Sequence, residues 1–497
     1  MNNKTINSNS VQSFWLALST FSSIAFSILS VAILSRFLSK SDYGTYRQIV
    51  YVYSILVVIF SAGLPSVYSF FLPKFTLEQG REIVSKISKI LFVGGMFCSF
   101  FLVIFSGVIA QFLKNPELSL GLKIFAPIPM MLMPTLGIDG IFATYKKTRY
   151  IAVFTVFTRL ITLFFILIPV IVFEGSYTHA LYGWNIASLL VLILSIYFKG
   201  VPFRDVMAAR SNLTLNEIFK YSLPLLTASL WGVAIKAADQ FYISHYFGSE
   251  VFAEFANGFI EIPFVIMITG SAATMLLPIF SKMIHDKADT SELILLWNSV
   301  LNKSIMLIYP MVIFFLVFAE EIVTVLYSDQ YIISAVYFRI NIFLNFFNII
   351  LVSPLLLAMG KARFYSNLHM CLALSSWGLG YLAIIAFNSP FSIAILSVSL
   401  NILKMIIAFI FISRVLEVKI TMLLPYKNIA IYVFHSLFVI LIVRTIMDAI
   451  VPELNPFLYL CVSGLFFLTS LLTSSVPLKI DYSSVLKPII ANFRRKI

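Results

Sequence analysis

The sequence predicts an all-α integral membrane protein with about 14 transmembrane helices, arranged as two six-helix lobes followed by two further helices. Two observations predict the class. The 497 residues are 60% hydrophobic and 11% charged, with a mean hydropathy of +0.97, whereas soluble domains are roughly 45–50% apolar and about 25% charged. The apolar residues also form runs of about 20, the length at which a helix crosses a hydrocarbon core of roughly 30 Å.

The first six runs form the predicted first lobe. They lie near residues 13–35, 48–72, 88–111, 121–143, 151–173 and 178–198. The first run follows the polar start MNNKTINSNSVQ and exceeds signal-peptide length, so we expect an uncleaved anchor. Helices are expected throughout because an unpaired backbone group in lipid costs several kcal/mol, and the runs are too uniformly apolar for alternating barrel strands.

Eight further runs follow the polar link from Lys199 to Asn216. They lie near residues 218–243, 252–279, 298–319, 332–358, 364–387, 391–413, 428–450 and 456–476. The link combines basic, polar and proline residues over a stretch too short and too polar to span a membrane. It is therefore the predicted boundary between the lobes.

An internal repeat supports the two-lobe organisation. Three short segments recur in the same order at a nearly constant offset: SRFLSKSDYGTY from Ser35 and SHYFGSEVFAEF from Ser244, LPKF from Leu72 and LPIF from Leu277, and KTRY from Lys147 and KARF from Lys361. Corresponding links lie on the same predicted side of the membrane, so the repeats are parallel. A duplicated scaffold without a transport path is the alternative reading.

The repeat sets the predicted domain boundaries. They are an N-terminal lobe (1–198), a cytoplasmic linker (199–217), a C-terminal lobe (218–414), and a segment with two extra helices and a basic cytoplasmic tail (415–497). Two lobes facing one another would enclose a central cavity.

The distribution of positive charge predicts the orientation. Most of the 35 Lys and Arg residues fall in one set of links and in the tail, and the opposite links hold Arg36, Lys40, Arg47, Lys114 and Lys123. Cytoplasmic loops carry such an excess, so both termini are predicted to be cytoplasmic. Orientation and attraction to anionic lipid account for the net charge of +13, and nucleic acid is not an expected partner.

Cysteine and histidine residues do not predict a metal site. Cys98, Cys371 and Cys461 fall singly in separate spans, and the five histidines show no ligand spacing such as HExxH. Packing roles are expected for them. No metal or resident cofactor is predicted.

Cations inside the spans are the candidate substrate-binding residues, because a mid-membrane charge costs about 2.5–3.5 kcal/mol on insertion scales. They are Arg36, Arg47, Arg159, Lys236, Arg339 and Lys404. Arg36 and Arg47 could instead reach the interface along their stems, and Lys236 could pair with an acid one turn on. Arg339 has no obvious local partner. Converging on one cavity, these cations would suit an anionic ligand, since an arginine pairs phosphate well.

Three acids are candidate ion-coupling residues. They are Asp139, Asp239 and Glu261. Asp139 stands between two glycines, and Pro263 is expected to bend the eighth span beside Glu261. Acids at such positions can bind H+ or Na+ and report its occupancy to helix packing.

The link LSRFLSKSDYGTYR, the parallel duplication and the echo from Ser244 resemble the Wzx-type polysaccharide flippases of the multidrug/oligosaccharidyl-lipid/polysaccharide exporter superfamily. The most specific element of this resemblance is Arg36 followed by Tyr43-Gly44. The resemblance covers nearly the whole chain, mostly as architecture. The two spans beyond the common twelve resemble the lipid II flippases instead.

The resemblance implies a V-shaped pair of lobes and a non-enzymatic function. A polyprenyl-diphosphate-linked oligosaccharide would move by ion-coupled alternating access from the cytoplasmic to the outer face of a bacterial inner membrane, for O-antigen, capsule or exopolysaccharide assembly. Membrane lipids, a polysaccharide polymerase and a chain-length regulator are the partners it implies. Three alternatives stay open: a lipid II flippase, a cation–drug antiporter of the same superfamily, and a membrane polysaccharide polymerase or ligase. The short outward links disfavour the enzymes, and the Arg-rich spans disfavour the antiporter.

Overall fold

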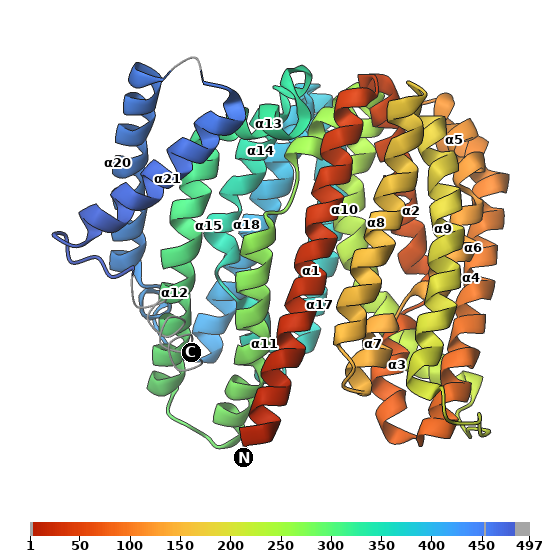
Figure 1. Cartoon of the computed structure of the whole chain (residues 1–497). Coiled ribbons are helices and arrows are strands. Elements are labelled where there is room, and N and C mark those ends of the chain that lie inside the picture. Colours follow the sequence, from red (N-terminus) through yellow and green to blue (C-terminus); the bar gives the residue numbers. More distant parts are fainter. Residues whose placement is uncertain (1–2, 452–453, 483–497) are drawn as a thin grey trace. The chain divides into compact units, whose positions relative to one another are not determined.

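The computed structural model describes residues 3–451 and 454–482, and this part of the chain is helical with no strand. It contains 14 helices long and apolar enough to cross a membrane, which confirms the predicted fold class. The chain divides into two compact units, Met1–Ala253 and Glu254–Ile497. Within each unit the long helices run side by side (Figure 1).

The first unit contains the first six spans and most of the seventh. Its helices are α1 (Asn3–Phe37), α2 (Lys40–Ser61), α3 (Pro65–Phe71), α4 (Leu77–Phe112), α5 (Glu117–Phe125), α6 (Pro127–Leu132), α7 (Ile138–Thr144), α8 (Arg149–Val172), α9 (Tyr177–Gly200) and α10 (Leu215–Gly258), with short 3-10 turns η1 (Leu72–Lys74), η2 (Met133–Thr135) and η3 (Val201–Phe203). Side chains of Ser or Thr cap the N-termini of two of the long helices. Ser39 accepts a hydrogen bond from the Asp42 amide at the start of α2, and Thr76 forms a capping box with Gln79 at the start of α4.

The fourth span is broken rather than continuous. The predicted run 121–143 is divided into α5, α6, η2 and α7. Pro127, Pro129 and Pro134 lack the amide that a helix interior needs. Gly137 then takes a left-handed conformation with φ 77° immediately before α7. These residues interrupt the helix, and the segments together still form one candidate membrane span, Glu117–Thr144.

A buried polar network docks the C-terminal part of α10 onto α2. The Gln48 side-chain amide donates to Ser244 Oγ at 2.7 Å, and Asn115 Nδ2 donates to Gln48 Oε1 at 2.6 Å and to Thr45 Oγ1 at 2.9 Å. Tyr51 adds a hydrogen bond from its hydroxyl to the Ala237 carbonyl at 3.0 Å. The network fixes the position of α10 because each buried amide finds its partner only in this arrangement.

Replacing Asn115 by leucine is expected to lower the free energy of unfolding by about 1–3 kcal/mol, because Gln48 Oε1 keeps its burial and loses its donor. Thermal unfolding of the purified protein in detergent measures the change. Gln111→Leu is the control, since the Gln111 side chain is exposed one turn earlier in the chain. Equal unfolding temperatures for the two variants would contradict a stabilising role of the network.

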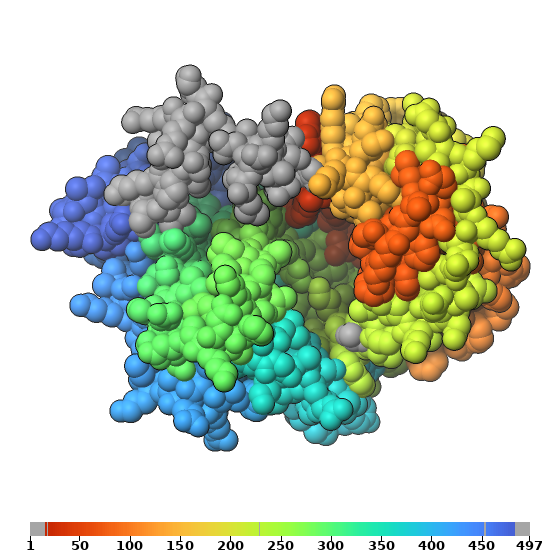
Figure 2. Space-filling view, turned by 90° about the horizontal axis from the view of Figure 1, so that it is seen from below, coloured from red at the N-terminus to blue at the C-terminus, as the bar shows by residue number. Residues whose placement is uncertain are grey.

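The link between α9 and α10 lies along the start of α4. Lys86 Nζ donates to the Leu213 carbonyl at 2.6 Å, and the Ala209 amide donates to the Glu78 carbonyl at 3.1 Å. Arg81 also donates to a carbonyl of the link. Figure 2 shows these two segments side by side at one end of the first unit. The predicted linker is therefore held against this unit, and the division into lobes at residues 199–217 stays a prediction.

The second unit repeats the broken-span pattern. Its helices are α11 (Pro263–His285), α12 (Thr290–Val317), α13 (Ala319–Tyr327), α14 (Ser334–Phe343), α15 (Asn345–Asn348), α16 (Val352–Ala358), α17 (Ala362–Phe387), α18 (Pro390–Val415), α19 (Ile420–Leu423), α20 (Tyr426–Ile450) and α21 (Pro456–Ser475), with the 3-10 turn η4 (Asp329–Tyr331). The span formed by α14, α15 and α16 is interrupted between Asn348 and Val352. It is the tenth span, which corresponds to the fourth in the predicted repeat.

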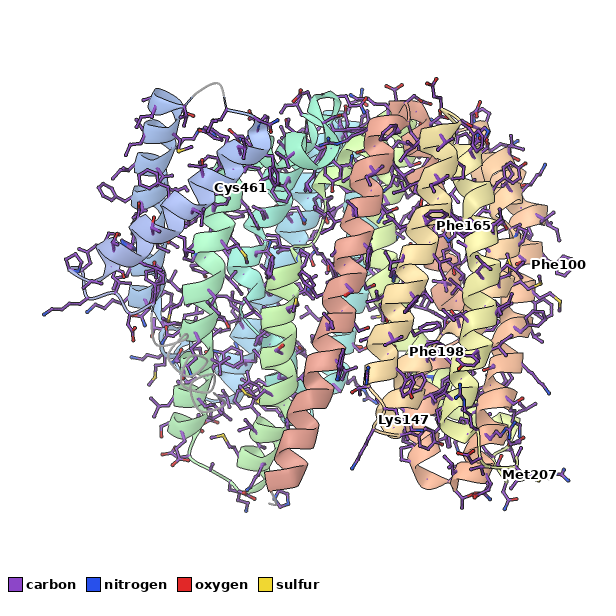
Figure 3. All side chains as sticks on the ribbon, viewed as in Figure 1. Phe100, Lys147, Phe165, Phe198, Met207 and Cys461 are labelled. Atoms are coloured by element: carbon purple, nitrogen blue, oxygen red, sulfur yellow. The ribbon has the colours of Figure 1, made fainter. Side chains whose placement is uncertain are left out.

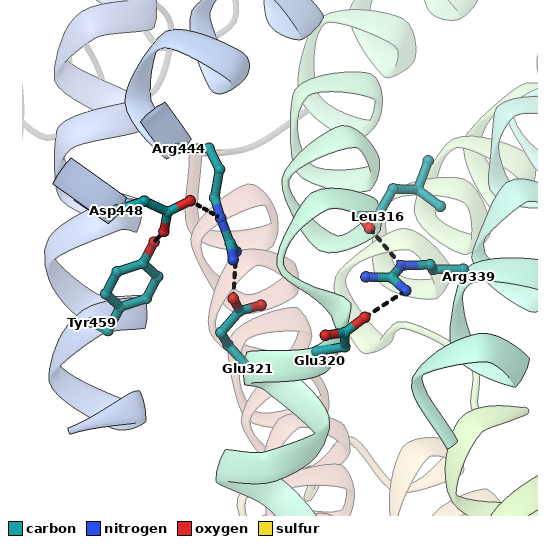
Figure 4. Close-up of polar contacts among 7 residues, drawn as sticks. All are labelled: Leu316, Glu320, Glu321, Arg339, Arg444, Asp448 and Tyr459. Carbon is teal, nitrogen blue, oxygen red and sulfur yellow. Dashed lines mark hydrogen bonds and ion pairs between the residues drawn. The ribbon is translucent and has the colours of Figure 1, made fainter. Parts of the chain in front are cut away.

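An apolar core and a charged cluster hold the second unit. Trp297 is buried among Phe280 and Phe409, and its indole donates to the Leu423 carbonyl at 3.0 Å. On α13, the neighbouring acids Glu320 and Glu321 each bind a different arginine (Figure 4). Glu321 binds Arg444 of α20, which also contacts an aspartate one turn on. This cluster anchors the first of the two extra helices to α13.

Candidate functional site

Arg159 is a mid-span cation for which the described residues of the first unit supply no polar partner. It lies ten residues after the start of α8, and its side chain is exposed on the surface of the unit. Among the described residues it makes no hydrogen bond and no ion pair. An unneutralised guanidinium at this depth is costly in lipid, so its position favours contact with water or with an anion.

Arg36 and Arg47 lie on the two helices joined by the link LSRFLSKSDYGTYR. Arg36 is exposed in the last turn of α1, where the helix dipole favours a cation. Arg47 is half-buried in α2 and donates to the Tyr43 hydroxyl at 3.2 Å. The two predicted site residues therefore lie in one unit, Arg36 at the end of α1 and Arg47 about two turns into α2.

Lys236 and Asp239 lie one turn apart on α10, with Lys236 exposed and Asp239 only 9% exposed. The predicted repeat assigns them to the second lobe, and in the structure they lie in the unit Met1–Ala253. Asp239 is near Ala237, whose carbonyl accepts from Tyr51 of α2. Asp239 thus belongs to the stretch of α10 that contacts α2, and it is buried there.

The other two candidate acids are exposed at helix breaks. Asp139 is in the first turn of α7, directly after the left-handed Gly137. Glu261 lies between α10 and α11. The predicted bend within the eighth span is wrong: Pro263 is the first residue of α11, a position where its missing amide is not needed, so the chain breaks before the proline.

In the second unit, the two predicted cations already have protein partners. Arg339 forms an ion pair with Glu320 at 2.9 Å and donates to the Leu316 carbonyl at 3.2 Å (Figure 4). This partner is not local in the sequence: folding brings up an acid from a neighbouring helix, 19 residues earlier in the chain. Lys404 is half-buried and donates to Asn401 Oδ1 at 3.2 Å. Convergence of these cations with those of the first unit stays a prediction.

Lys199 is a buried cation, although the sequence assigns it to the predicted cytoplasmic linker. It is 6% exposed at the end of α9 and donates to four oxygens from neighbouring elements. In contrast, Lys147 extends from the surface between α7 and α8 (Figure 3). A lysine beside Gly200 at the end of an apolar run has the same local pattern whether it reaches water or turns inward.

No metal-binding cluster is found in the part of the chain that the structure describes. No group of three or more His, Cys, Asp or Glu side chains there could hold a metal ion. The candidate residues are cations and carboxylates, side chains that can bind an anionic ligand and a small cation.

The chain resembles known proteins in both sequence and fold. The family described as polysaccharide biosynthesis protein matches residues 33–336. An uncharacterized membrane protein of Methanocaldococcus jannaschii, MJ1068, is 21% identical over 348 residues, which are 65% of this chain and 67% of that protein.

Two solved structures share the fold. The lipid II flippase MurJ in an inward closed conformation gives a TM-score of 0.70 at 13% identity, over 96% of this chain and 99% of that chain. An inward-facing multidrug resistance transporter of the MATE family in the MOP superfamily gives 0.61 at 12% identity, over 80% and 94%. The matched family residues make up more than half of the 497 residues, so the chain belongs to the polysaccharide biosynthesis protein family.

Proposed function

We propose that the protein is a flippase that moves a polyprenyl-diphosphate-linked oligosaccharide from the cytoplasmic to the outer face of a bacterial inner membrane. The observation that carries the proposal is the exposed guanidinium of Arg159, which has no polar partner among the described residues, within a span of a polysaccharide biosynthesis protein. Sugars and diphosphate cannot cross hydrocarbon unaided, whereas the prenyl chain is soluble there. A transporter for this lipid needs a hydrated, basic path for the headgroup and lateral access for the tail.

The six candidate cations differ in how strongly the structure supports a role in binding the headgroup. Arg159 has the strongest case because no described residue neutralises it. Arg36, Arg47 and Lys236 share its unit and could extend a basic path for the anionic headgroup. Arg339 has the weakest case, because a diphosphate would have to compete with Glu320 for its guanidinium. Lys404 needs only to exchange a neutral amide partner for phosphate.

Coupling to H+ or Na+ is the second part of the proposal. Asp139 and Glu261 are exposed carboxylates at breaks between helices, where occupation by an ion could change how the flanking helices pack. Asp239 is buried near the contact of α10 with α2, so its protonation would change how these two helices pack. Alternating access driven by these acids would expose the binding path first to the cytoplasm, the side on which the charge distribution predicts both termini, and then to the outer face.

Lipid II is the second candidate substrate. The fourteen candidate spans and the coverage of 99% of the lipid II flippase chain support it, whereas the MATE transporter aligns with only 80% of this chain. Lipid II also carries a diphosphate and a prenyl chain. The same cations would therefore serve either lipid, and only the sugar contacts would differ.

Reconstituted flipping tests the proposal and separates the candidates. Purified protein in proteoliposomes is given polyprenyl-diphosphate oligosaccharide, lipid II or a cationic dye, each with a fluorescent label, under Na+ and pH gradients. We expect accelerated, gradient-dependent flipping of the first lipid and less of lipid II. Preference for lipid II would select the second candidate. Dye transport without lipid flipping would overturn the proposal in favour of a drug antiporter.

A further inference from the structure

Lys199 lies in a cage of neutral oxygens at the end of α9. Its Nζ donates to the Pro134 carbonyl at 2.6 Å and to the Leu136 carbonyl at 3.1 Å. It also donates to Ser88 Oγ at 3.1 Å and to the Tyr68 hydroxyl at 3.2 Å. These partners come from α3, α4 and the broken fourth span. One side chain therefore ties three elements to α9.

The two carbonyls in the cage are those that the helix break deprives of partners. In an unbroken helix, Pro134 and Leu136 would accept from amides four residues on. Here α7 begins only at Ile138, and the Ile141 amide bonds to the Gly137 carbonyl at 3.3 Å. A buried carbonyl without a hydrogen-bond donor destabilises a membrane protein strongly. The ammonium of Lys199 supplies donors that the backbone of the break does not.

The same side chain fixes the turn from two directions. The Tyr68 hydroxyl accepts from Lys199, while its ring packs so closely on Gly137 that a Cβ there would lie 2.4 Å from a ring carbon. Ser88 and the Tyr68 hydroxyl are themselves joined at 2.9 Å. Gly137 is thus held by a ring on one side and by the bonds to its preceding residues on the other. Asp139 follows two residues later, in the first turn of α7.

We propose that Lys199 is a positioning residue for Asp139, which it acts on by pinning the broken turn of the fourth span. The inference rests on the proposed function in that it takes Asp139 as an ion-coupling acid. An ammonium has three N–H groups, and the four oxygens around it are neutral. All of its bonding capacity is therefore directed to the turn and to the two residues that support it.

The test compares Lys199→Gln with Lys147→Gln, the matched loss of an exposed lysine near α7. Hydrogen–deuterium exchange of the amides from Leu136 to Ile141 reads the turn directly. We expect exchange at least about tenfold faster in Lys199→Gln, because hydrogen bonds to a charged donor are lost. Exchange should be unchanged in the control. Lys199→Arg should restore part of the protection because it keeps the charge and the donors.

Ion dependence provides the second readout. In proteoliposomes, Lys199→Gln should raise the Na+ or H+ concentration for half-maximal flipping by about tenfold with little loss of maximal rate. In an Asp139→Asn background, which already lacks the coupling carboxylate, adding Lys199→Gln should change the residual flipping no further. Ion-dependent protection of the same amides gives this shift without any transported lipid, so a failure of the proposed substrate leaves it measurable. Unchanged exchange at the turn, or an unmoved ion dependence, would overturn the proposal.

A purely structural role would give a different pattern. Exchange would then rise equally over α4, α7 and α9, and the maximal rate would fall without a shift in ion dependence. That pattern also overturns the proposal. If Lys199→Gln fails to fold, Ser88→Ala and Tyr68→Phe each remove one acceptor and leave the ammonium in place. Each should still speed exchange at the turn by a few-fold, and normal exchange in both would overturn the proposal.

Discussion

Replacing Gly44 by alanine is expected to displace the C-terminal part of α10 from α2 and to abolish transport. A Cβ at this position would lie 2.1 Å from the Ser249 carbonyl oxygen and 2.6 Å from its carbon, and both are backbone atoms that cannot rotate away. The helices would have to separate, which would strain the nearby hydrogen bond from Gln48 to Ser244. Overpacking of this kind costs about 1–3 kcal/mol. Thermal unfolding and flipping by the purified variant measure the two effects.

Gly107→Ala is the matched control for this substitution. Gly107 also lies inside a long helix, and a Cβ added there would meet no neighbouring atom within 4 Å. Alanine is the better helix former, so the control should gain about 0.5–1 kcal/mol if helix propensity alone matters. The two variants should therefore move the unfolding temperature in opposite directions. A stabilised, active Gly44→Ala protein would show that the close approach of α2 and α10 is dispensable.

The Tyr43-Gly44 pair illustrates what the sequence can and cannot predict. The motif supported the family resemblance, but its physical reason is a backbone contact with Ser249, far away in the sequence. The spans themselves follow from the local need for about 20 apolar residues, which a single sequence displays. Contacts between helices depend on which faces meet. A hydrophobic run carries little information about that, because all its faces are apolar.

Buried charges show the same limit in a second way. The sequence predicted that Lys199 begins the polar link and that Arg159 lies within the fifth apolar run. The structure reverses their environments: Lys199 is enclosed by four oxygens, and the Arg159 side chain is exposed. Arg339 acquires its acid from a helix that precedes it by a turn and a loop. In each case the partner is set by tertiary packing rather than by spacing along one helix.

Replacing Arg159 by alanine is expected to reduce flipping of a diphosphate-linked oligosaccharide by two orders of magnitude or more and to eliminate surface polysaccharide in cells. The guanidinium can bind a diphosphate through paired, charge-assisted hydrogen bonds, each worth about 1.5–3 kcal/mol. Arg159→Lys should restore part of the rate, because an ammonium keeps the charge but not the planar fork. Arg149→Ala removes a cation at the start of the same helix and is the control.

Protein stability distinguishes this role from a lipid-facing arginine that merely reaches the interface. Removing a mid-span charge makes insertion easier, by about 2.5–3.5 kcal/mol on insertion scales. Arg159→Ala should therefore accumulate at or above the level of the unmodified protein and still fail to transport. An arginine without a function would give the same gain in insertion with transport intact. Full flipping by Arg159→Ala would remove the residue from the binding path, and the chain would then have to bind the headgroup through cations that already have protein partners.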